Sequence, residues 1–237
     1  MWAGNPNMLY LNELGSNDQR SADRGREAID TRGAGTYDSA GFGAFPLADR
    51  RTILDAEQMR RVVRRMAGEV LERNGGTAGL LLVGIRTRGV PLAESLAAQI
   101  GEMEGGEAIP LGVLDINLYR DDLSTVANYP VVKESRLPGT IDDQIVVLCD
   151  DVLFTGRTIR AALDALIDYG RPSSVRLAVL IDRGLRELPI QPDIVGQRVE
   201  TTHDESVEVR FLEVDGEDGV DVTTVAPVAD APKTEGE

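Results

Sequence analysis

The stretch VVLCDDVLFTGRTIRAALDAL, from Val146 to Leu166, is the part of the chain that decides the fold. It opens with a short apolar run that ends at Cys149, continues with two acidic residues, and passes through a small turn that contains glycine, Thr155–Thr158. Apolar residues at helical spacing follow the turn. This order predicts a buried strand, a tight turn and a helix, with the turn at the carboxyl end of the strand.

The same alternation of strands and helices extends to both sides of this stretch. A helix is predicted from about Asp55 to about Arg73, because Asp55 and Gln58 have the spacing of a capping box. Apolar runs predict strands at 79–85, 111–119, 145–148 and 175–181, and further helices are predicted at 91–100 and 158–169. Strands that alternate with helices indicate an α/β fold with a mainly parallel, twisted sheet that is flanked by helices.

Composition predicts one compact domain with loose ends in this chain of 237 residues. We predict that residues 1–47 are a disordered extension, that residues 48–222 form the domain, and that residues 223–237 are a disordered acidic tail. The only cysteine, Cys149, cannot form an intramolecular disulfide, which favours a reducing, cytoplasmic setting. No apolar run approaches the roughly 20 residues that cross a bilayer, so no membrane segment is expected.

The net charge of −15 argues against a nucleic-acid partner, because two polyanions repel each other. Its distribution weakens this argument. Eleven acidic residues against two basic ones lie between Asp204 and Glu237, so the rest of the chain is only weakly acidic. The predicted helix after Asp55 is rich in arginine and forms a basic cluster in this weakly acidic part.

The residues around the turn predict a site for a sugar phosphate. Asp150 and Asp151 are expected just beyond the apolar strand, where their carboxylates could accept hydrogen bonds from the vicinal hydroxyls of a ribose. The turn offers N–H groups and hydroxyls to a phosphate at the start of a helix, from Thr155, Gly156, Arg157 and Thr158. A simpler interpretation stays open at this point, since two acids that cap a helix and a glycine that turns the chain would look alike.

Four segments in this order resemble the type I phosphoribosyltransferases, and the resemblance spans about residues 51–214. Within that group they are most similar to the family that combines uracil phosphoribosyltransferase activity with regulation of pyrimidine-operon attenuation. The segments are VGIRTRG at 83–89, DINLYRDDLS at 115–124, DDVLFTGRTIR at 150–160 and GRPSSVRLAVLIDRGLRELPI at 170–190. The resemblance implies the type I phosphoribosyltransferase fold, with a small hood over the sheet.

The resemblance also implies which residues bind phosphoribosyl pyrophosphate. The turn Thr155–Thr158 would bind its 5′-phosphate, and Asp150 and Asp151 its ribose hydroxyls. The pyrophosphate would lie against the loop formed by Arg86, Thr87 and Arg88. Arg120 belongs to a segment that matches the flexible loop closing over the reacting atoms. Asp150, Asp151, Arg88 and Arg120 are therefore the expected catalytic residues.

In the reaction that the resemblance implies, uracil displaces pyrophosphate at C1 of the ribose and UMP is formed. Such a site must align the reactants and neutralise the leaving pyrophosphate, a task suited to arginine and Mg²⁺. The implied metal is Mg²⁺, held on substrate oxygens and only indirectly by Asp150 and Asp151. The residues expected near uracil are Asp182, Arg183, Ile194 and Val195, and the stretch 193–196 is expected to form part of the hood.

The family's second partner is the leader RNA of a pyrimidine operon, and the candidate RNA-binding residues are Arg60, Arg64, Thr87, Arg183 and Arg186. For the helix arginines, a solvated face paired with Glu57 and Glu69 is the simpler alternative. Leu185 stands where a histidine is expected in such regulators, which removes a stacking group.

Two other functions stay open on the sequence alone. One is an RNA-binding attenuator with vestigial catalysis, and the other is a phosphoribosyltransferase for another base. The resemblance implies a homodimer or homotetramer in either case.

Overall fold

The computed structural model describes residues 47–119 and 134–225. The chain divides into two units, Met1–Ala44 and Phe45–Glu237, and every described residue belongs to the second unit. The predicted extension up to residue 46, the tail from residue 226 and the predicted catalytic Arg120 lie outside the described residues. The described part begins with a strand at Leu47 and ends with a strand at Val225, so it reaches slightly beyond the predicted domain at both ends.

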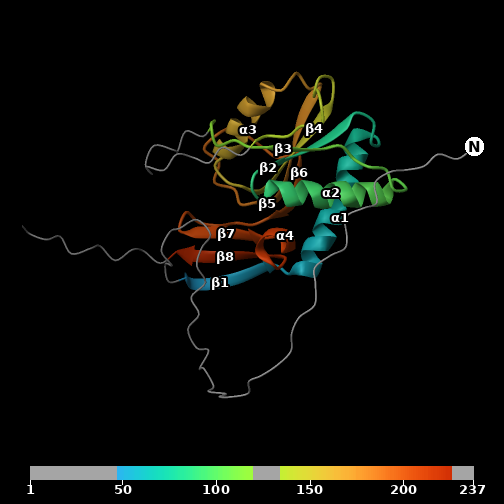
Figure 1. Cartoon of the computed structure of the whole chain (residues 1–237). Coiled ribbons are helices and arrows are strands. Elements are labelled where there is room, and N and C mark those ends of the chain that lie inside the picture. Colours follow the sequence, from blue (N-terminus) through green and yellow to red (C-terminus); the bar gives the residue numbers. More distant parts are fainter. Residues whose placement is uncertain (1–46, 120–133, 226–237) are drawn as a thin grey trace, which may run out of the picture. The chain divides into compact units, whose positions relative to one another are not determined.

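A five-stranded parallel sheet forms the centre of the fold, as the alternating pattern predicts (Figure 1). Its strands run side by side in the order β3-β2-β4-β5-β6, and each neighbouring pair is parallel. The bounds are β2 (Leu80–Ile85), β3 (Leu111–Leu114), β4 (Ile145–Leu153), β5 (Ser174–Asp182) and β6 (Ile194–Arg198). The strand that carries the two acids, β4, is therefore central and flanked on both sides.

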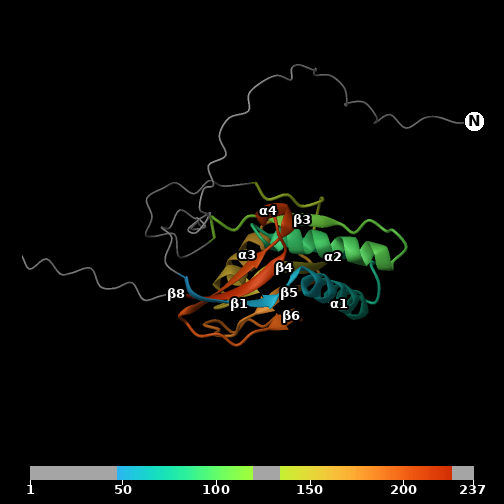
Figure 2. The same ribbon diagram turned by 90° about the horizontal axis from the view of Figure 1, so that it is seen from below.

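Three helices cover the two faces of this sheet (Figures 1 and 2). They are α1 (Ala56–Asn74), α2 (Gly89–Met103) and α3 (Arg157–Ile167). Alternate residues of β2 point to opposite faces, so Leu80 and Leu82 join the core under α1 and α2, whereas Leu81 joins the core under α3. The predicted capping box of α1 is confirmed, because Asp55 and Gln58 exchange backbone-to-side-chain hydrogen bonds of 2.8 and 2.9 Å.

A second sheet of three antiparallel strands lies below the larger one in Figure 1. It is built from β1 (Leu47–Leu54), β7 (Glu205–Arg210) and β8 (Gly219–Val225), in the order β1-β8-β7. A single helical turn, α4 (Leu212–Asp215), connects β7 to β8. Buried apolar side chains of this sheet, such as Val209 and Val220, join the core under α1 and α2. The small sheet and the helices therefore share one hydrophobic core.

Two strand predictions need correction in length. The strand predicted at 111–119 ends at Leu114, because Asp115 accepts a hydrogen bond from the Asn117 N–H (2.9 Å) and starts a turn. The strand predicted at 145–148 continues to Leu153, because its ladder with β5 runs on through Asp150. The two acids thus lie inside β4, and not beyond its end as expected.

The prediction that residues 193–196 form part of the hood is wrong. These residues lead into β6, which pairs in parallel with β5 at the edge of the large sheet. The stretch is too short for its apolar pattern to show which sheet it joins.

Within the described residues, none of the helices combines the length and apolar character that a membrane span requires.

Candidate functional site

The large sheet reverses its winding direction between β2 and β4. From β2 the chain crosses to β3 on one side, whereas from β4 it crosses to β5 on the other side. The helices that follow these two strands, α2 and α3, lie on opposite faces of the sheet. In open parallel sheets, ligands bind at the carboxyl ends of strands at such a reversal. The two predicted binding segments, the loop 86–88 after β2 and the turn 155–158 after β4, thus follow the two strands at which the sheet reverses.

The predicted phosphate turn leads directly from β4 into α3. Gly156 precedes the helix with φ of 94°, a left-handed conformation that favours glycine. The Thr155 carbonyl accepts hydrogen bonds from the N–H groups of Glu187 (3.0 Å) and Leu188 (3.1 Å), which hold the turn in place. A pocket of about 260 Å³ is lined by residues 152–159. The start of α3 opens on it, and the N–H groups and dipole of a helix start favour a phosphate.

The two acids of β4 have different surroundings, although they are adjacent. Asp150 is buried, and one of its carboxylate oxygens accepts a hydrogen bond from the Asp151 N–H at 3.1 Å. Burial raises the pKa of the Asp151 carboxyl, and this rise is opposed by hydrogen bonding with Asp150 and by the positive charge of Arg88. A carboxylate with a raised pKa, close to a cation at the mouth of a sheet, is a good candidate for a functional group.

The predicted pyrophosphate loop is followed directly by Gly89, which packs against the middle of β4. Gly89 packs against β4 so closely that a Cβ atom there would lie 2.3 Å from the Cys149 carbonyl oxygen. The peptide bond between Arg86 and Thr87 is cis. The Arg86 side chain donates to the Glu134 carbonyl (3.3 Å), and Thr87 is exposed. The loop is thus held next to Asp150 and Asp151.

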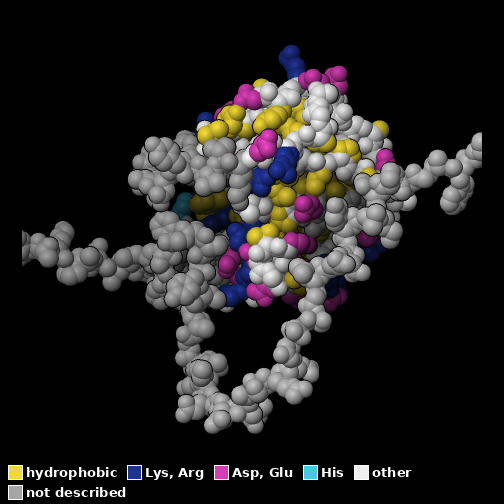
Figure 3. All heavy atoms as spheres, viewed as in Figure 1, with side chains coloured by type: hydrophobic (Ala, Val, Ile, Leu, Met, Phe, Trp, Pro, Cys, Tyr) yellow, Lys and Arg dark blue, Asp and Glu magenta, His cyan; other side chains and the backbone are white. Residues whose placement is uncertain are grey.

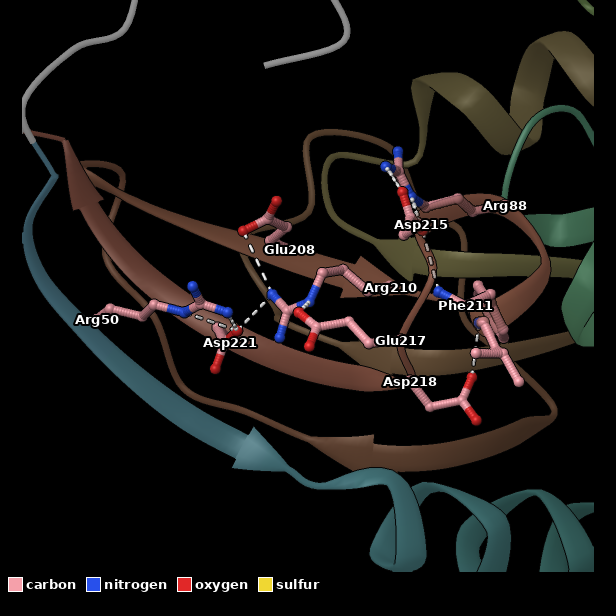
Figure 4. A network of polar contacts seen from close by, with 10 residues as sticks. Arg50, Arg88, Glu208, Arg210, Phe211, Asp215, Glu217, Asp218 and Asp221 are labelled. Atoms are coloured by element: carbon pink, nitrogen blue, oxygen red, sulfur yellow. Dashed lines mark hydrogen bonds and ion pairs between the residues drawn. The ribbon is translucent and has the colours of Figure 1, made fainter. Parts of the chain in front are cut away.

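Arg88 forms an ion pair that no motif in the sequence predicted. Its Nη2 donates to Oδ1 of Asp215 at 2.9 Å, and its Nε lies 3.4 Å from Oδ2 of the same carboxylate (Figure 4). The hydrogen bond that Arg88 donates to Asp215 raises the pKa of Arg88. Burial acts to raise the pKa of Asp215, but its hydrogen bond with Arg88 contributes to holding that pKa below the usual value. No local sequence signal marks this partner, since Asp215 lies 127 residues away in a single helical turn.

The residues predicted to lie near uracil are only partly brought together. Asp182 ends β5 directly opposite Leu153 and forms ion pairs with Arg186 and, at 3.8 Å, with Arg198. Arg183 is buried, with its guanidinium carbon 4.2 Å from the ring centroid of Phe154, the residue directly before the phosphate turn. These two residues therefore lie beside the phosphate turn.

The other two residues predicted near uracil have different positions. Ile194 is fully buried in the core under α1, and Val195 is half-buried on the other side of β6. Their contact with uracil remains a prediction.

The candidate RNA-binding residues fall into two groups. Arg60 and Arg64 are exposed on α1, form no ion pair with any described residue, and line a groove of about 570 Å³ between α1, α2 and the segment around α4. Arg183 and Arg186 instead point inward and donate to backbone carbonyls, such as those of Thr202 and Phe154. Figure 3 shows basic and acidic side chains interleaved on the face with the small sheet. Arg60 and Arg64, together with the exposed Thr87, are thus the members of this set whose side chains are open to a partner.

Most of the chain is similar to known proteins of one family. Residues 49–211 match the family described as "Phosphoribosyl transferase domain". The chain is 54% identical over 178 residues to the "Bifunctional protein PyrR" of Pelotomaculum thermopropionicum, covering 75% of this chain and 98% of that protein. It is 56% identical over 170 residues to the protein of the same name from Thermus aquaticus, covering 72% and 93%.

Solved structures show the same fold at low sequence identity. The hypoxanthine phosphoribosyltransferase of Trypanosoma cruzi superposes with a TM-score of 0.56 at 14% identity, covering 74% of this chain and 97% of that one. A hypoxanthine phosphoribosyltransferase from Staphylococcus aureus gives a TM-score of 0.54 at 19% identity, covering 76% and 94%. The type I phosphoribosyltransferase fold that the resemblance implied is therefore confirmed.

Proposed function

The chain belongs to the phosphoribosyl transferase domain family and, within it, to the bifunctional PyrR proteins, and on this premise we propose that it is a uracil phosphoribosyltransferase that also regulates pyrimidine-operon attenuation. One observation carries the catalytic part of the proposal. The loop 86–88 follows β2 and the turn 155–158 follows β4, the two strands at which the sheet reverses, and Asp150 and Asp151 lie on β4 where Gly89 packs against it. This arrangement suits a ligand with a phosphate at one end, a ribose in the middle and a second anionic group.

The proposed substrate is phosphoribosyl pyrophosphate, bound across the two loops. Its 5′-phosphate would lie at the start of α3, on the N–H groups and hydroxyls of residues 155–158. Its ribose hydroxyls would donate hydrogen bonds to Asp150 and Asp151. Its pyrophosphate would lie against the loop 86–88, where it would contact the guanidinium of Arg88, whose positive charge also acts on Asp151.

In the proposed reaction, N1 of uracil forms a bond to C1 of the ribose while the bond from C1 to the pyrophosphate oxygen breaks. The proton of N1 is released, and the products are UMP and pyrophosphate. The protein's part is to align the reactants, to exclude water and to offset the charge on the leaving group, with Arg88 contributing the positive charge. Arg120, outside the described residues, is proposed to act on the same group.

The residues present fit Mg²⁺ as the implied cofactor. Mg²⁺ prefers oxygen ligands, keeps several waters, and is usually held by one or two carboxylates together with substrate phosphates. Asp150 and Asp151 would hold the metal only indirectly, through the ribose and pyrophosphate oxygens, and within the described ranges no group of three or more metal-binding side chains is present. When bound, the metal would neutralise charge on the pyrophosphate oxygens.

Uracil is proposed as the base because the relatives with more than half of their residues identical are bifunctional PyrR proteins. Asp182 and Arg183, beside the phosphate turn, are its proposed neighbours, together with Ile194 and Val195. Turnover of phosphoribosyl pyrophosphate with Mg²⁺ should be measured with uracil and with hypoxanthine. We expect UMP from uracil, whereas turnover with hypoxanthine alone would assign the site to another base.

The proposed RNA partner is the leader of a pyrimidine operon, and Arg60 and Arg64 on α1 support it. They are exposed arginines that form no ion pair within the described residues, so their charge is available to phosphates. Thr87, Arg183 and Arg186 are the other proposed RNA contacts, and the guanidinium groups of the two arginines donate to carbonyl oxygens of the chain itself. A mobility shift with the organism's own leader, with and without UMP, tests this part.

The family resemblance further supports a homodimer or homotetramer and a cytoplasmic location. Measuring the mass of the protein in solution at several concentrations tests the first of these expectations.

A further inference from the structure

The ion pair between Arg88 and Asp215 joins the two sheets at the mouth of the site (Figure 4). Arg88 directly precedes α2, in the loop that follows β2 of the large sheet. Asp215 is the last residue of α4, which connects two strands of the small sheet. Side-chain exposure is 31% for Arg88 and 16% for Asp215, so the contact is partly shielded from water. Ion pairs of this kind are stronger than those on an open surface.

The carboxylate of Asp215 is itself held in a fixed place. Its Oδ2 accepts a hydrogen bond from the Phe211 N–H at 3.0 Å, and its own N–H donates to the Phe211 carbonyl at 2.7 Å. The Phe211 side chain is buried in the core under α1 and α2. Because the Asp215 carboxylate is hydrogen-bonded to the backbone of a buried residue, it has little conformational freedom. It can therefore fix the orientation of the Arg88 guanidinium.

Arg88 keeps donors to spare after it has bound Asp215. A guanidinium group has five N–H donors, and Asp215 contacts only Nε and Nη2. Nη1 and the second hydrogen of Nη2 remain for another anion. Arg88 directly precedes Gly89, which packs against Asp150 of β4, and the charge of Arg88 acts on the neighbouring Asp151. The same side chain can therefore hold Asp215 and face a ligand at the carboxyl end of the sheet.

We infer that Asp215 is a positioning residue, which holds the Arg88 guanidinium in the orientation that receives the pyrophosphate of phosphoribosyl pyrophosphate. This inference rests on the proposed function. An arginine side chain loses considerable rotamer freedom when it is fixed, and a partner that fixes it beforehand removes this cost from substrate binding. The small sheet thereby contributes to the site through a residue that does not touch the substrate.

Asp215 could instead have a purely structural role, as a cap of α4. The experiment must distinguish this role from the positioning of Arg88. The chain offers a matched control in Asp218, whose Oδ1 accepts a hydrogen bond from the Leu212 N–H at 2.9 Å. Asp218 therefore also holds α4 by a carboxylate, but among the described contacts it has none with Arg88. Asp215→Asn and Asp218→Asn remove the same charge from the same turn.

The experiment compares the wild type, Asp215→Asn, Asp218→Asn, Arg88→Ala and the double variant Asp215→Asn with Arg88→Ala. We expect Asp215→Asn to raise the KM for phosphoribosyl pyrophosphate by about tenfold, the size of one lost charge-assisted contact, with little change in the KM for uracil. Asp218→Asn should stay within about twofold of the wild type. In the Arg88→Ala background, Asp215→Asn should have no further effect, because it acts through Arg88.

Equal losses in Asp215→Asn and Asp218→Asn, or an undiminished loss in the Arg88→Ala background, would overturn the inference. Melting temperatures identify a variant that has lost its fold, and Asp215→Glu then provides the second test, since it keeps the charge and should restore much of the affinity. Calorimetric binding of phosphoribosyl pyrophosphate provides the comparison independently of turnover. A wild-type chain that binds this compound but does not convert uracil would refute the uracil activity alone. A wild-type chain that does not bind phosphoribosyl pyrophosphate would refute both the proposed function and the positioning role of Asp215.

Discussion

Gly89 and the carbonyl group of Cys149 are in direct contact, and a Cβ atom on Gly89 would lie 2.3 Å from the Cys149 oxygen. The next nearest atom to that Cβ position is the Asp150 Cα, at 3.2 Å. Both neighbours are backbone atoms of the central strand, which cannot move aside without disturbing its ladders to β2 and β5. The absence of a side chain at this one residue therefore allows the pyrophosphate loop to lie against the two acids.

Gly89→Ala should displace the loop 86–88 from β4. We expect a loss of at least about tenfold in kcat/KM for phosphoribosyl pyrophosphate, because misplacement by an ångström is costly to a positioned site. Gly68→Ala is the matched control, since Gly68 lies inside α1 and a Cβ atom there would have no other atom within 4 Å. Alanine favours a helix over glycine by about 1 kcal/mol, so this control should be neutral or slightly stabilising. Similar kinetics for the two variants would contradict the account.

Asp151→Asn should lower turnover by at least about tenfold, because it weakens the positioning of the ribose. Its effect on stability should have the opposite sign. The pKa of Asp151 is raised in the folded chain, so the folded state binds its proton more tightly than the unfolded state and loses stability as the pH rises. An uncharged asparagine avoids this penalty.

We therefore expect Asp151→Asn to have a higher melting temperature than the wild type at pH 7, with the difference shrinking as the pH falls. Steady-state kinetics and thermal melts between pH 4 and pH 8 provide the measurement. A variant with full turnover, or one that melts earlier at pH 7, would speak against the assigned role or environment of this carboxylate.

Asp221→Asn should destabilise the small sheet. The Asp221 side chain is fully buried, and its Oδ2 accepts hydrogen bonds from Arg50 and lies 2.5 Å from Nη1 of Arg210 (Figure 4). Removing its charge leaves Arg210, which is 14% exposed, without its nearest anion inside the sheet. We expect a loss of about 2 kcal/mol in the free energy of unfolding, measured by urea denaturation. Glu208→Gln, which removes a half-exposed carboxylate 3.6 Å from Arg210, should cost much less.

The same network predicts how stability depends on pH. Burial acts to raise the pKa of Asp221, but its hydrogen bonds from Arg50 and Arg210 help to hold that pKa below the usual value. A lowered pKa in the folded state gives stability that is present above the unfolded value of about 4 and is lost as the pH falls through the folded value. Wild-type protein should lose this contribution below about pH 4, and Asp221→Asn should lose less. If the wild type and Asp221→Asn lost stability equally as the pH falls, the assigned role of Asp221 would be disproved.

Arg64→Ala should weaken binding of the pyrimidine leader RNA by several-fold and reduce the salt dependence of the affinity. Each lost phosphate contact lowers the slope of log affinity against log salt by about 0.7 to 0.9. Arg61→Ala on the same helix is the control, because Arg61 is already paired with Glu57. Affinities measured at several salt concentrations give both slopes. Equal effects of the two substitutions would indicate that only the overall charge of α1 matters.

Some of this structure could be predicted from local sequence, because the signals lie close together along the chain. The capping box of Asp55 and Gln58 is formed within one helical turn. The apolar run before Asp150 predicts a strand even when the neighbouring strands are not known. The small sheet is different. Its strand β1, with the sequence LADRRTIL, has no clear alternation, and it pairs with a strand about 170 residues further on, as in Thr52 opposite Asp221.

The site follows the same division. The turn at Gly156 and the acids of β4 could be found because they are contiguous, whereas the end of the strand could not, since polar residues can continue a ladder. Asp215 was missed because its partner Arg88 is brought to it only by the tertiary fold. The inward direction of Arg183 and Arg186 likewise depends on carbonyl groups from other segments.

We propose that the turn after β4 and the loop after β2 hold one phosphorylated ribose between them. A crystal structure of this chain with UMP is the decisive measurement. We expect the 5′-phosphate of UMP on the backbone N–H groups of residues 155–158, and the ribose hydroxyls within hydrogen-bond distance of Asp150 and Asp151. A UMP molecule bound elsewhere, with this turn empty, would contradict it.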